Sequence, residues 1–448
     1  MTNDSRGIPV TGADTFAVRR YEAALGQFQS YVGDPIATID DALADAPAFI
    51  AGHLLKVLVL YTLAERKFVP MAAEALDAAR GHADRANDRE RGLIAAAELL
   101  VAGRWDRACQ ALDRVLVEHP RDALALQVGH LMDFYRGDAL NLRNRVSRVL
   151  PHWDASTPGY SYVLGMHAFG LEEMGQYPEA ESTALEALSI QPKDGWSVHA
   201  VVHVMEMQGR IDEGIAFLQS REGDWSPDNA FAFHNFWHLA LFCMDGAHHD
   251  RALALFDAHI HPGPAAYVLS LLDATALLWR LQLEGVDVAD RFDRVADDWQ
   301  SRLDSEPGFS AFNDAHAAMA FAATNREAAL SALLSRMRQA AAADDTNAMM
   351  TREVGLPLAE AVAAFARGRY GESIAAIEPM RDQAHRFGGS HAQRDLITLT
   401  LIEAALRDGD YGRARHYVGE RIVHKRGSRW AQRLWSRATS TAPPAAAA

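Results

Sequence analysis

Four histidines near the middle of the chain have the type and spacing of a metal site. His199 and His203 are four residues apart, and so are His234 and His238. This spacing puts both rings of a pair on one face of a helix. The pairs lie 35 residues apart, which is the length of one helix–turn–helix repeat, so neighbouring helices would present them from equivalent positions. Neutral imidazoles are ligands for zinc, iron or manganese, and we expect these four to bind a divalent metal.

Three further polar side chains could carry catalytic chemistry beside this cluster. Glu206 follows His203 by one helical turn, and Asp273 holds the position that His234 holds one repeat earlier. His316 follows on the next predicted inner helix. Water activated at a metal and by a neighbouring carboxylate would support hydrolysis or lyase chemistry. We therefore assign catalytic roles to Glu206, Asp273 and His316.

Two alternatives stay open for the histidines. They could be acids or bases in a metal-free polar pocket, or they could be packing residues. With 19 histidines in 448 residues, about one such pair is expected by chance, but two pairs in repeat register are not. The aromatic residues around them are more typical of a core than of a substrate platform. These are Trp196, Phe233, Phe236 and Trp237.

A second polar cluster, FGGSHAQRD, occupies residues 387–395. Ser390 can cap a helix that begins there, and Arg394 can bind a carboxylate or phosphate at the helix start or pair with an acid such as Asp395. If the array curls, this cluster would face the histidines, although 155 residues separate His238 from Gln393. The predicted substrate-binding residues are Asn235, Asn313, Gln393, Arg394 and Asp395.

A repeated turn indicates how these residues are positioned. Gly-x-aromatic followed by a small residue occurs as GRWDRA at 103–108, GQYPEA at 175–180, GRYGES at 368–373 and GDYGRA at 409–414. Gly175 and a weaker copy at Gly209 are 34 residues apart. Small residues at helix crossings and an aromatic at the turn are typical of tetratricopeptide helix pairs. The sequence predicts an all-α, tetratricopeptide-like superhelix, and leaves open whether it closes around a central cavity.

The same patterns divide the chain into three parts. Residues 1–35 are expected to form an extended arm and a first helix, and 36–438 the repeat array. The tail 439–448 has no periodicity and is expected to be disordered. A basic cluster near the end could bind an anion or form the solvated face of a capping helix. Its members are Arg421, Lys425, Arg426, Arg429, Arg433 and Arg437.

Composition limits the partners and the compartment. The net charge of −15 argues against binding to nucleic acid or to anionic membranes. Two cysteines without a CxxC pair favour a reducing compartment. The N-terminus has no secretory signal pattern and no apolar run reaches membrane-spanning length, so we expect a cytoplasmic protein. The oligomeric state is not indicated.

Several motifs together resemble the tetratricopeptide repeat protein 38 family. They are DGWSVHAVVHVMEM at 194–207, HNFWHLAL at 234–241, LFDAHI at 255–260, FNDAH at 312–316, VGLP at 354–357 and GGSHAQRD at 388–395. The resemblance covers nearly the whole chain and implies a helical-repeat fold. Every histidine, acid and amide singled out above falls on these motifs, apart from Asp273.

Two functions follow from these observations. The predicted inner wall of His, Asp, Glu and Asn suits a metal and a small polar or anionic substrate, which favours a metal-dependent hydrolase or lyase. Tetratricopeptide grooves that hold peptides generally use Lys, Arg and Asn. The alternative is a non-catalytic scaffold that binds a partner peptide, with a structural histidine cluster.

Overall fold

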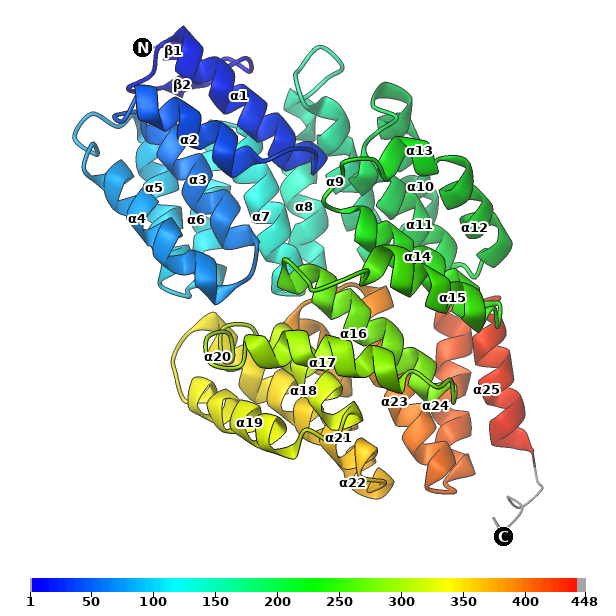
Figure 1. Cartoon of the computed structure of the whole chain (residues 1–448). Coiled ribbons are helices and arrows are strands. Elements are labelled where there is room, and N and C mark those ends of the chain that lie inside the picture. Colours follow the sequence, from blue (N-terminus) through cyan, green and yellow to red (C-terminus); the bar gives the residue numbers. More distant parts are fainter. Residues whose placement is uncertain (1, 441–448) are drawn as a thin grey trace.

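The structure, a computed structural model, describes residues 2–440, so the tail residues 441–448 lie outside the described residues. The predicted extended arm is a short antiparallel hairpin, in which β1 (Thr2–Asn3) pairs with β2 (Pro9–Val10). The rest of the described chain is helical, as predicted. In Figure 1 the helices run from α1 at the upper left through α14 and then turn back beneath the first half.

The first half of the array consists of α1 (Thr15–Ser30), α2 (Pro35–Asp45), α3 (Ile50–Thr62), η1 (Arg66–Phe68), α4 (Val69–Arg80), α5 (Asp88–Val101), α6 (Trp105–Glu118), α7 (Ala123–Tyr135), α8 (Ala139–Val149), η2 (Leu150–His152), α9 (Tyr160–Glu173), α10 (Tyr177–Ile190), α11 (Gly195–Met207) and α12 (Ile211–Ser220). The second half consists of α13 (Glu222–Trp225), α14 (Ala232–Asp245), α15 (His249–Leu255), η3 (Phe256–Ile260), α16 (Val268–Leu283), α17 (Ala289–Ser301), α18 (Ala311–Ala323), α19 (Glu327–Ala341), α20 (Thr346–Met350), η4 (Thr351–Gly355), α21 (Leu356–Ala366), α22 (Tyr370–Ile377), η5 (Arg381–Phe387), α23 (His391–Arg407), α24 (Tyr411–His424) and α25 (Arg429–Thr439).

The predicted turn glycines end the first helix of each pair. Gly103, Gly175 and Gly209 all have φ near +70°, the left-handed conformation in which glycine has no steric penalty. GAHHDRA at 246–252 departs from this pattern. Ala247 takes the left-handed position that glycine holds in the other turns, with φ of 62°, whereas Gly246 stays helical. The turn is no longer than its neighbours, because Ala247 and His248 donate to the Met244 and Cys243 carbonyls as Gly103 and Arg104 donate to those of Leu100 and Leu99.

The array closes on itself, because distant segments of the chain share backbone hydrogen bonds. Thr346 donates its N–H to the Gly103 carbonyl at 3.0 Å, and its hydroxyl accepts the N–H of Trp105 at 3.0 Å. The Glu306 carboxylate accepts the backbone N–H groups of Arg66 at 2.7 Å and Lys67 at 3.1 Å. These contacts join α3–α6 to α18–α20, which lie next to one another in Figure 1.

A second closure holds the C-terminal helices against the middle of the chain. Asp245, the last residue of α14, accepts the N–H of Arg429 at 2.7 Å and the Ser428 hydroxyl at 2.6 Å. The predicted final helix is therefore α25, and it packs on α14 rather than ending an open array.

The residues of the basic cluster take part in this packing. Arg421 and Lys425 are buried, so the expectation of a solvated cap face or a free anion site is wrong for both. Three of the others pair with acids on helices outside α24 and α25: Arg429 with Asp212, Arg433 with Glu284 and Arg437 with Glu403.

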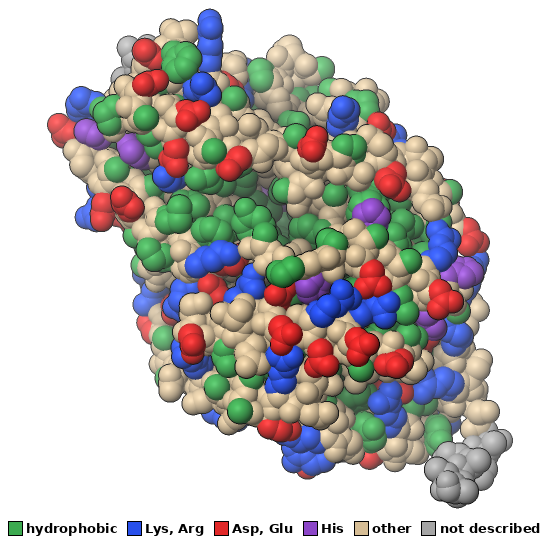
Figure 2. Space-filling view, in the orientation of Figure 1, with side chains coloured by type: hydrophobic (Ala, Val, Ile, Leu, Met, Phe, Trp, Pro, Cys, Tyr) green, Lys and Arg blue, Asp and Glu red, His purple; other side chains and the backbone are tan. Residues whose placement is uncertain are grey.

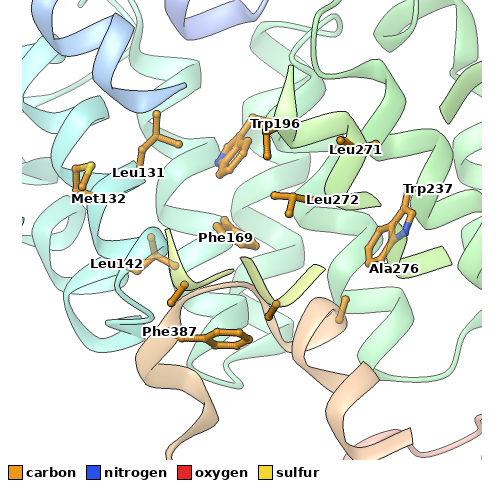
Figure 3. Close-up of a cluster of buried hydrophobic side chains, with 14 of the residues drawn as sticks. Leu131, Met132, Leu142, Phe169, Trp196, Trp237, Leu271, Leu272, Ala276 and Phe387 are labelled. Atoms are coloured by element: carbon orange, nitrogen blue, oxygen red, sulfur yellow. The ribbon is translucent and has the colours of Figure 1, made fainter. Parts of the chain in front are cut away.

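Apolar side chains from both halves meet in the interior. Figure 3 shows residues of α7, α8, α9, α11, α14, α16 and η5 in one cluster, including Leu131, Phe169, Trp196, Leu272 and Phe387. On the surface, Figure 2 shows a hollow with hydrophobic side chains along the junction between the two halves. No helix among the described residues is long and apolar enough to cross a membrane.

Candidate metal centre

Two neighbouring helices bring the four histidines together. His199 and His203 lie on α11, and His234 and His238 lie on α14, one repeat later. The Asp194 carboxylate caps α11 by accepting the N–H of Trp196 at 3.0 Å, which sets where the helix begins. One ring nitrogen from each histidine lies within 4.8 Å of those of the other three, and all four residues are buried.

Carboxylates accept hydrogen bonds from Nδ1 of two of the imidazoles, and a third imidazole lies near a carboxylate without a hydrogen bond to it. Nδ1 of His234 lies 2.6 Å from Asp273, and Nδ1 of His238 lies 2.9 Å from Glu206. Nδ1 of His203 lies 3.4 Å from Glu172. A carboxylate on Nδ1 keeps the proton on that nitrogen and leaves Nε2 as a lone pair. The same arrangement orients metal-binding histidines in zinc proteins.

The other ring nitrogens of the cluster face one another, and there are too few N–H groups for every nitrogen to take part in a hydrogen bond. Nε2 of His234 and Nε2 of His199 are 3.1 Å apart. Neither Nε2 of His238 nor Nε2 of His203 has a hydrogen-bond partner among the described residues. Two nitrogens that bind one zinc at 2.0–2.1 Å in tetrahedral geometry are about 3.3 Å apart. The separation of the first pair therefore fits two ligands of one metal.

Burial keeps three of these imidazoles neutral, as metal binding requires. It lowers the pKa of His203 to about 4 and that of His238 to about 3. Burial also lowers the pKa of His199 well below its usual value, and the neighbouring histidines act in the same direction. His199, His203 and His238 therefore offer lone pairs at neutral pH without first becoming deprotonated.

The Glu206 carboxylate stays charged because a lysine faces it. Burial acts to raise its pKa, but Lys425, 2.6 Å away, and His238 hold that pKa well below its usual range. Lys425 also lies 3.3 Å from Asp395, which pairs with Arg421 at 2.9 Å. This buried ion-pair network joins α11 and α14 to α23 and α24. It fixes the carboxylate that orients His238.

Aromatic rings enclose the cluster. Trp237 stacks on His234 with ring centroids 5.3 Å apart, and Phe169 and Phe231 each lie 5.1–5.2 Å from His199. Trp196 and Trp237 are buried, in agreement with the core assignment. Phe231 is half-buried and lies beside His234, whose side chain is 10% exposed. His234 is thus the most exposed of the four histidines.

Most of the other predicted site residues bond to the backbone or to charged side chains. Asn235 donates to the Gly195 carbonyl at 3.2 Å, and Asn313 donates to the Ala64 carbonyl at 2.9 Å. His316, on α18, contacts the Phe312 carbonyl at 2.8 Å through Nδ1, and burial lowers its pKa to about 4. Gln393 completes the capping box of α23 with Ser390, as the sequence predicts for that serine.

Arg394 connects the second polar cluster to the first. Its guanidinium lies 3.2 Å from Glu173, and a carboxylate oxygen of Glu173 lies within 4.8 Å of a ring nitrogen of His203. One carboxylate therefore separates Arg394 from the histidines. Arg394 and His391 also line a cleft of about 760 Å³, whose other walls are the α5–α6 and α7–α8 turns, α20 and η5.

Sequence reasoning missed Glu172 and Glu173 at the end of α9. Repeat register could have found the first, since Glu172 and Glu206 are each three residues before a turn glycine and 34 residues apart. Burial raises the pKa of Glu172 well above its usual range. Glu173, in contrast, has a lowered pKa: burial acts to raise it, but His391 and Arg394 outweigh burial.

Comparison with known proteins adds little beyond the fold. No family model matches the chain. A tetratricopeptide repeat protein from Parabacteroides merdae aligns over 62% of this chain and 99% of its own, at 12% identity and a TM-score of 0.35. The human IFIT1 dimer with m7Gppp-AAAA aligns over 95% of both chains, at 13% identity and a TM-score of 0.43. The Cut9–Hcn1 hetero-tetramer of the APC/C aligns over 95% of this chain and 76% of the other, at 12% identity and a TM-score of 0.44.

Proposed function

We propose that this chain is a metalloenzyme in which His199, His203, His234 and His238 bind one divalent transition metal. The observation that supports it most is the convergence of four buried ring nitrogens within 4.8 Å of one another. Carboxylates on Nδ1 of His234 and His238 add to that support. Imidazole donors suit zinc, iron and manganese. The proposal includes membership of the tetratricopeptide repeat protein 38 family and a place in the cytoplasm.

The chemistry that fits the centre is hydrolysis or elimination on a small polar or anionic substrate. A bound metal would supply Lewis acidity there. In this proposal Asp273 and Glu206 orient His234 and His238, because both carboxylates already accept hydrogen bonds from those rings. Arg394, on the wall of the cleft, would bind the anionic group of the substrate.

A non-catalytic scaffold is the second candidate, and the burial of the histidines favours it. A zinc site with four protein ligands is closed, and closed sites are structural, whereas catalytic zinc sites keep one position open. In this version the metal would lock α11 to α14. A partner peptide would then bind elsewhere on the array.

Turnover by metal-free and metal-loaded protein distinguishes the two candidates. We expect the protein loaded with zinc or manganese to hydrolyse at least one member of a panel of small esters, amides and phosphate esters. A chelator should abolish turnover and re-addition of metal should restore it. His199→Ala should lose both metal and turnover, while His167→Ala should keep both, because His167 bonds to Ser147 outside the cluster.

Stoichiometric metal without turnover on any panel member, together with a peptide recovered in complex with the protein, would establish the scaffold instead. Protein that binds no metal after reconstitution would contradict the metalloenzyme and leave a scaffold whose histidine cluster is structural.

A further inference from the structure

Next to the four histidines lies a second group of side chains with metal-ligand character. Glu172 and Glu173, at the end of α9, each bring a carboxylate oxygen within 4.8 Å of a ring nitrogen of His203 on α11. All three residues are buried. His203 belongs to this group as well as to the four-histidine cluster.

Glu172 has no donor to satisfy it. Its side chain is 0% exposed, and neither of its oxygens accepts a hydrogen bond from the described residues. The nearest basic atom is Nδ1 of His203, at 3.4 Å, which is also without a hydrogen-bond partner. A buried carboxylate without a partner is costly and rare in folded proteins. The 3.4 Å separation is close to the distance of about 3.3 Å between two ligands of one tetrahedral metal.

Glu173 is held in place from its other side. Its carboxylate accepts the backbone N–H of His391 at 2.8 Å and a guanidinium N–H of Arg394 at 3.2 Å. These two donors come from α23, so the C-terminal part of the chain fixes the orientation of Glu173 towards α11. The phenol of Tyr177 is a further ionisable group near both carboxylates.

We propose that Glu172, Glu173 and Nδ1 of His203 bind a second divalent cation. This inference rests on the proposed four-histidine centre, which His203 would join to the second site through Nε2. Two carboxylates and one imidazole suit manganese, iron or zinc, and their two negative charges balance a divalent ion. Binding would displace the proton on Nδ1 of His203 and the proton on the Glu172 carboxyl, and both leave to solvent.

The second site is connected to a cleft through two side chains. His391 and Arg394 contact the proposed ligand Glu173 and also line the cleft of about 760 Å³. The pair of metals would then lie between the cleft and the histidines.

Metal counting on matched variants tests the second site. Wild-type protein, stripped and reloaded with manganese or zinc, should bind about two equivalents, and Glu172→Gln about one. Glutamine keeps the shape of the side chain and removes its charge. An unchanged far-UV circular dichroism spectrum of metal-free Glu172→Gln shows that it folds. Glu179→Gln, an exposed change in the first turn of α10, is the matched control and should bind two.

A spectroscopic measurement shows whether the two ions share a ligand. Manganese-loaded wild-type protein should give an electron paramagnetic resonance spectrum with spin coupling, and Glu172→Gln should give that of an isolated ion.

The outcomes separate this inference from the centre on which it rests. One equivalent in the wild type that Glu172→Gln retains and His199→Ala loses would overturn the second site and leave the four-histidine centre standing. No bound metal in the wild type would overturn both.

Discussion

At the scale of single residues, what distinguishes this chain is that its histidines are oriented as well as gathered. His199 and His203 could have been packing residues, and their spacing alone does not exclude this. In the structure, Asp273 and Glu206 fix which nitrogen of His234 and His238 carries the proton. Packing does not require a carboxylate on Nδ1 of each of these two imidazoles, whereas a metal centre uses such carboxylates to set lone-pair directions.

The variant Asp273→Asn tests that orientation. Asparagine keeps the shape but accepts more weakly, so Nδ1 of His234 should hold its proton less firmly. We expect the affinity for zinc to fall about 10- to 100-fold. Competition with a chromogenic chelator measures it. Asp250→Asn, an exposed change on α15, is the control, and equal affinities of the two variants would show that Asp273 does not orient a ligand.

Another buried acid, Asp314 on α18, gives a prediction about stability and pH. Burial raises its pKa to about 7, although the N–H of Gly308 opposes this. The folded state therefore binds a proton that the unfolded state releases above a pKa of 3.8. Stability from this group is full below 3.8 and is lost as pH rises through about 7.

Asp314→Asn removes that loss. Its gain in unfolding free energy over the wild type should grow from near zero at pH 4 to about 1–3 kcal/mol at pH 7.5. Urea unfolding of both proteins at the two pH values measures the gain. A gain that is equal at both values would mean that Asp314 titrates normally in the fold.

At the scale of helices and turns, repeat register explains how the site is built. Because α11 and α14 are successive first helices, positions about one turn apart on them meet: His199 lies ten residues before the left-handed Gly209, and His234 lies thirteen before the left-handed Ala247. In the same way Glu172 of α9, three residues before Gly175, lies beside His203, six before Gly209. Turn glycines maintain the register, and one of them also makes close approach possible. A Cβ on Gly137 would lie 1.6 Å from the His385 carbonyl oxygen, so the α7–α8 turn abuts η5 without a side chain between them.

Two glycine variants distinguish the cost of a left-handed alanine from the cost of disturbing the contact between the α7–α8 turn and η5. Gly137 and Gly175 both have positive φ, at 63° and 73°, but a Cβ on Gly175 meets nothing within 4 Å. Gly175→Ala should cost about 1–2 kcal/mol, the penalty of a left-handed alanine. Gly137→Ala should cost about 1–3 kcal/mol more, because the turn must move away from η5. Chemical unfolding measures the two costs, and equal costs would mean that η5 yields freely.

The helices and their caps could be predicted from the sequence, but most of the groups that contact the site residues could not. Helix bounds followed from periodicity, and Ser390 was predicted as an N-cap because such signals are local. The pairing of Lys425 with Glu206 was not predicted, since 219 residues separate them and only closure brings them together. Asn235 and Asn313 were predicted to bind substrate, but their amides reach backbone carbonyls that no local pattern reveals.

At the scale of the whole molecule, closure makes the array one cooperative body. In an open array each repeat contacts only its neighbours, and the ends can unfold separately. Here α25 packs on α14, and α20 packs against the start of α6. The buried network around Glu206 and Lys425 therefore depends on both the middle and the end of the chain.

Unfolding should reflect that closure. We expect a single transition in urea, with the same midpoint by far-UV circular dichroism and by tryptophan fluorescence. Trp105 lies where α6 contacts α20, and Trp430 lies in α25, which packs on α14, so tryptophan fluorescence reports on both closures. Two resolved midpoints would mean that the halves unfold independently.

The measurement that tests the central claim most directly is elemental analysis of the protein purified without a metal-affinity tag. The four-histidine centre predicts at least about one equivalent of zinc, iron or manganese in the wild type and in His167→Ala, and its loss in His199→Ala. Less than about a tenth of an equivalent of any transition metal in the wild type, unchanged after reconstitution, would contradict it.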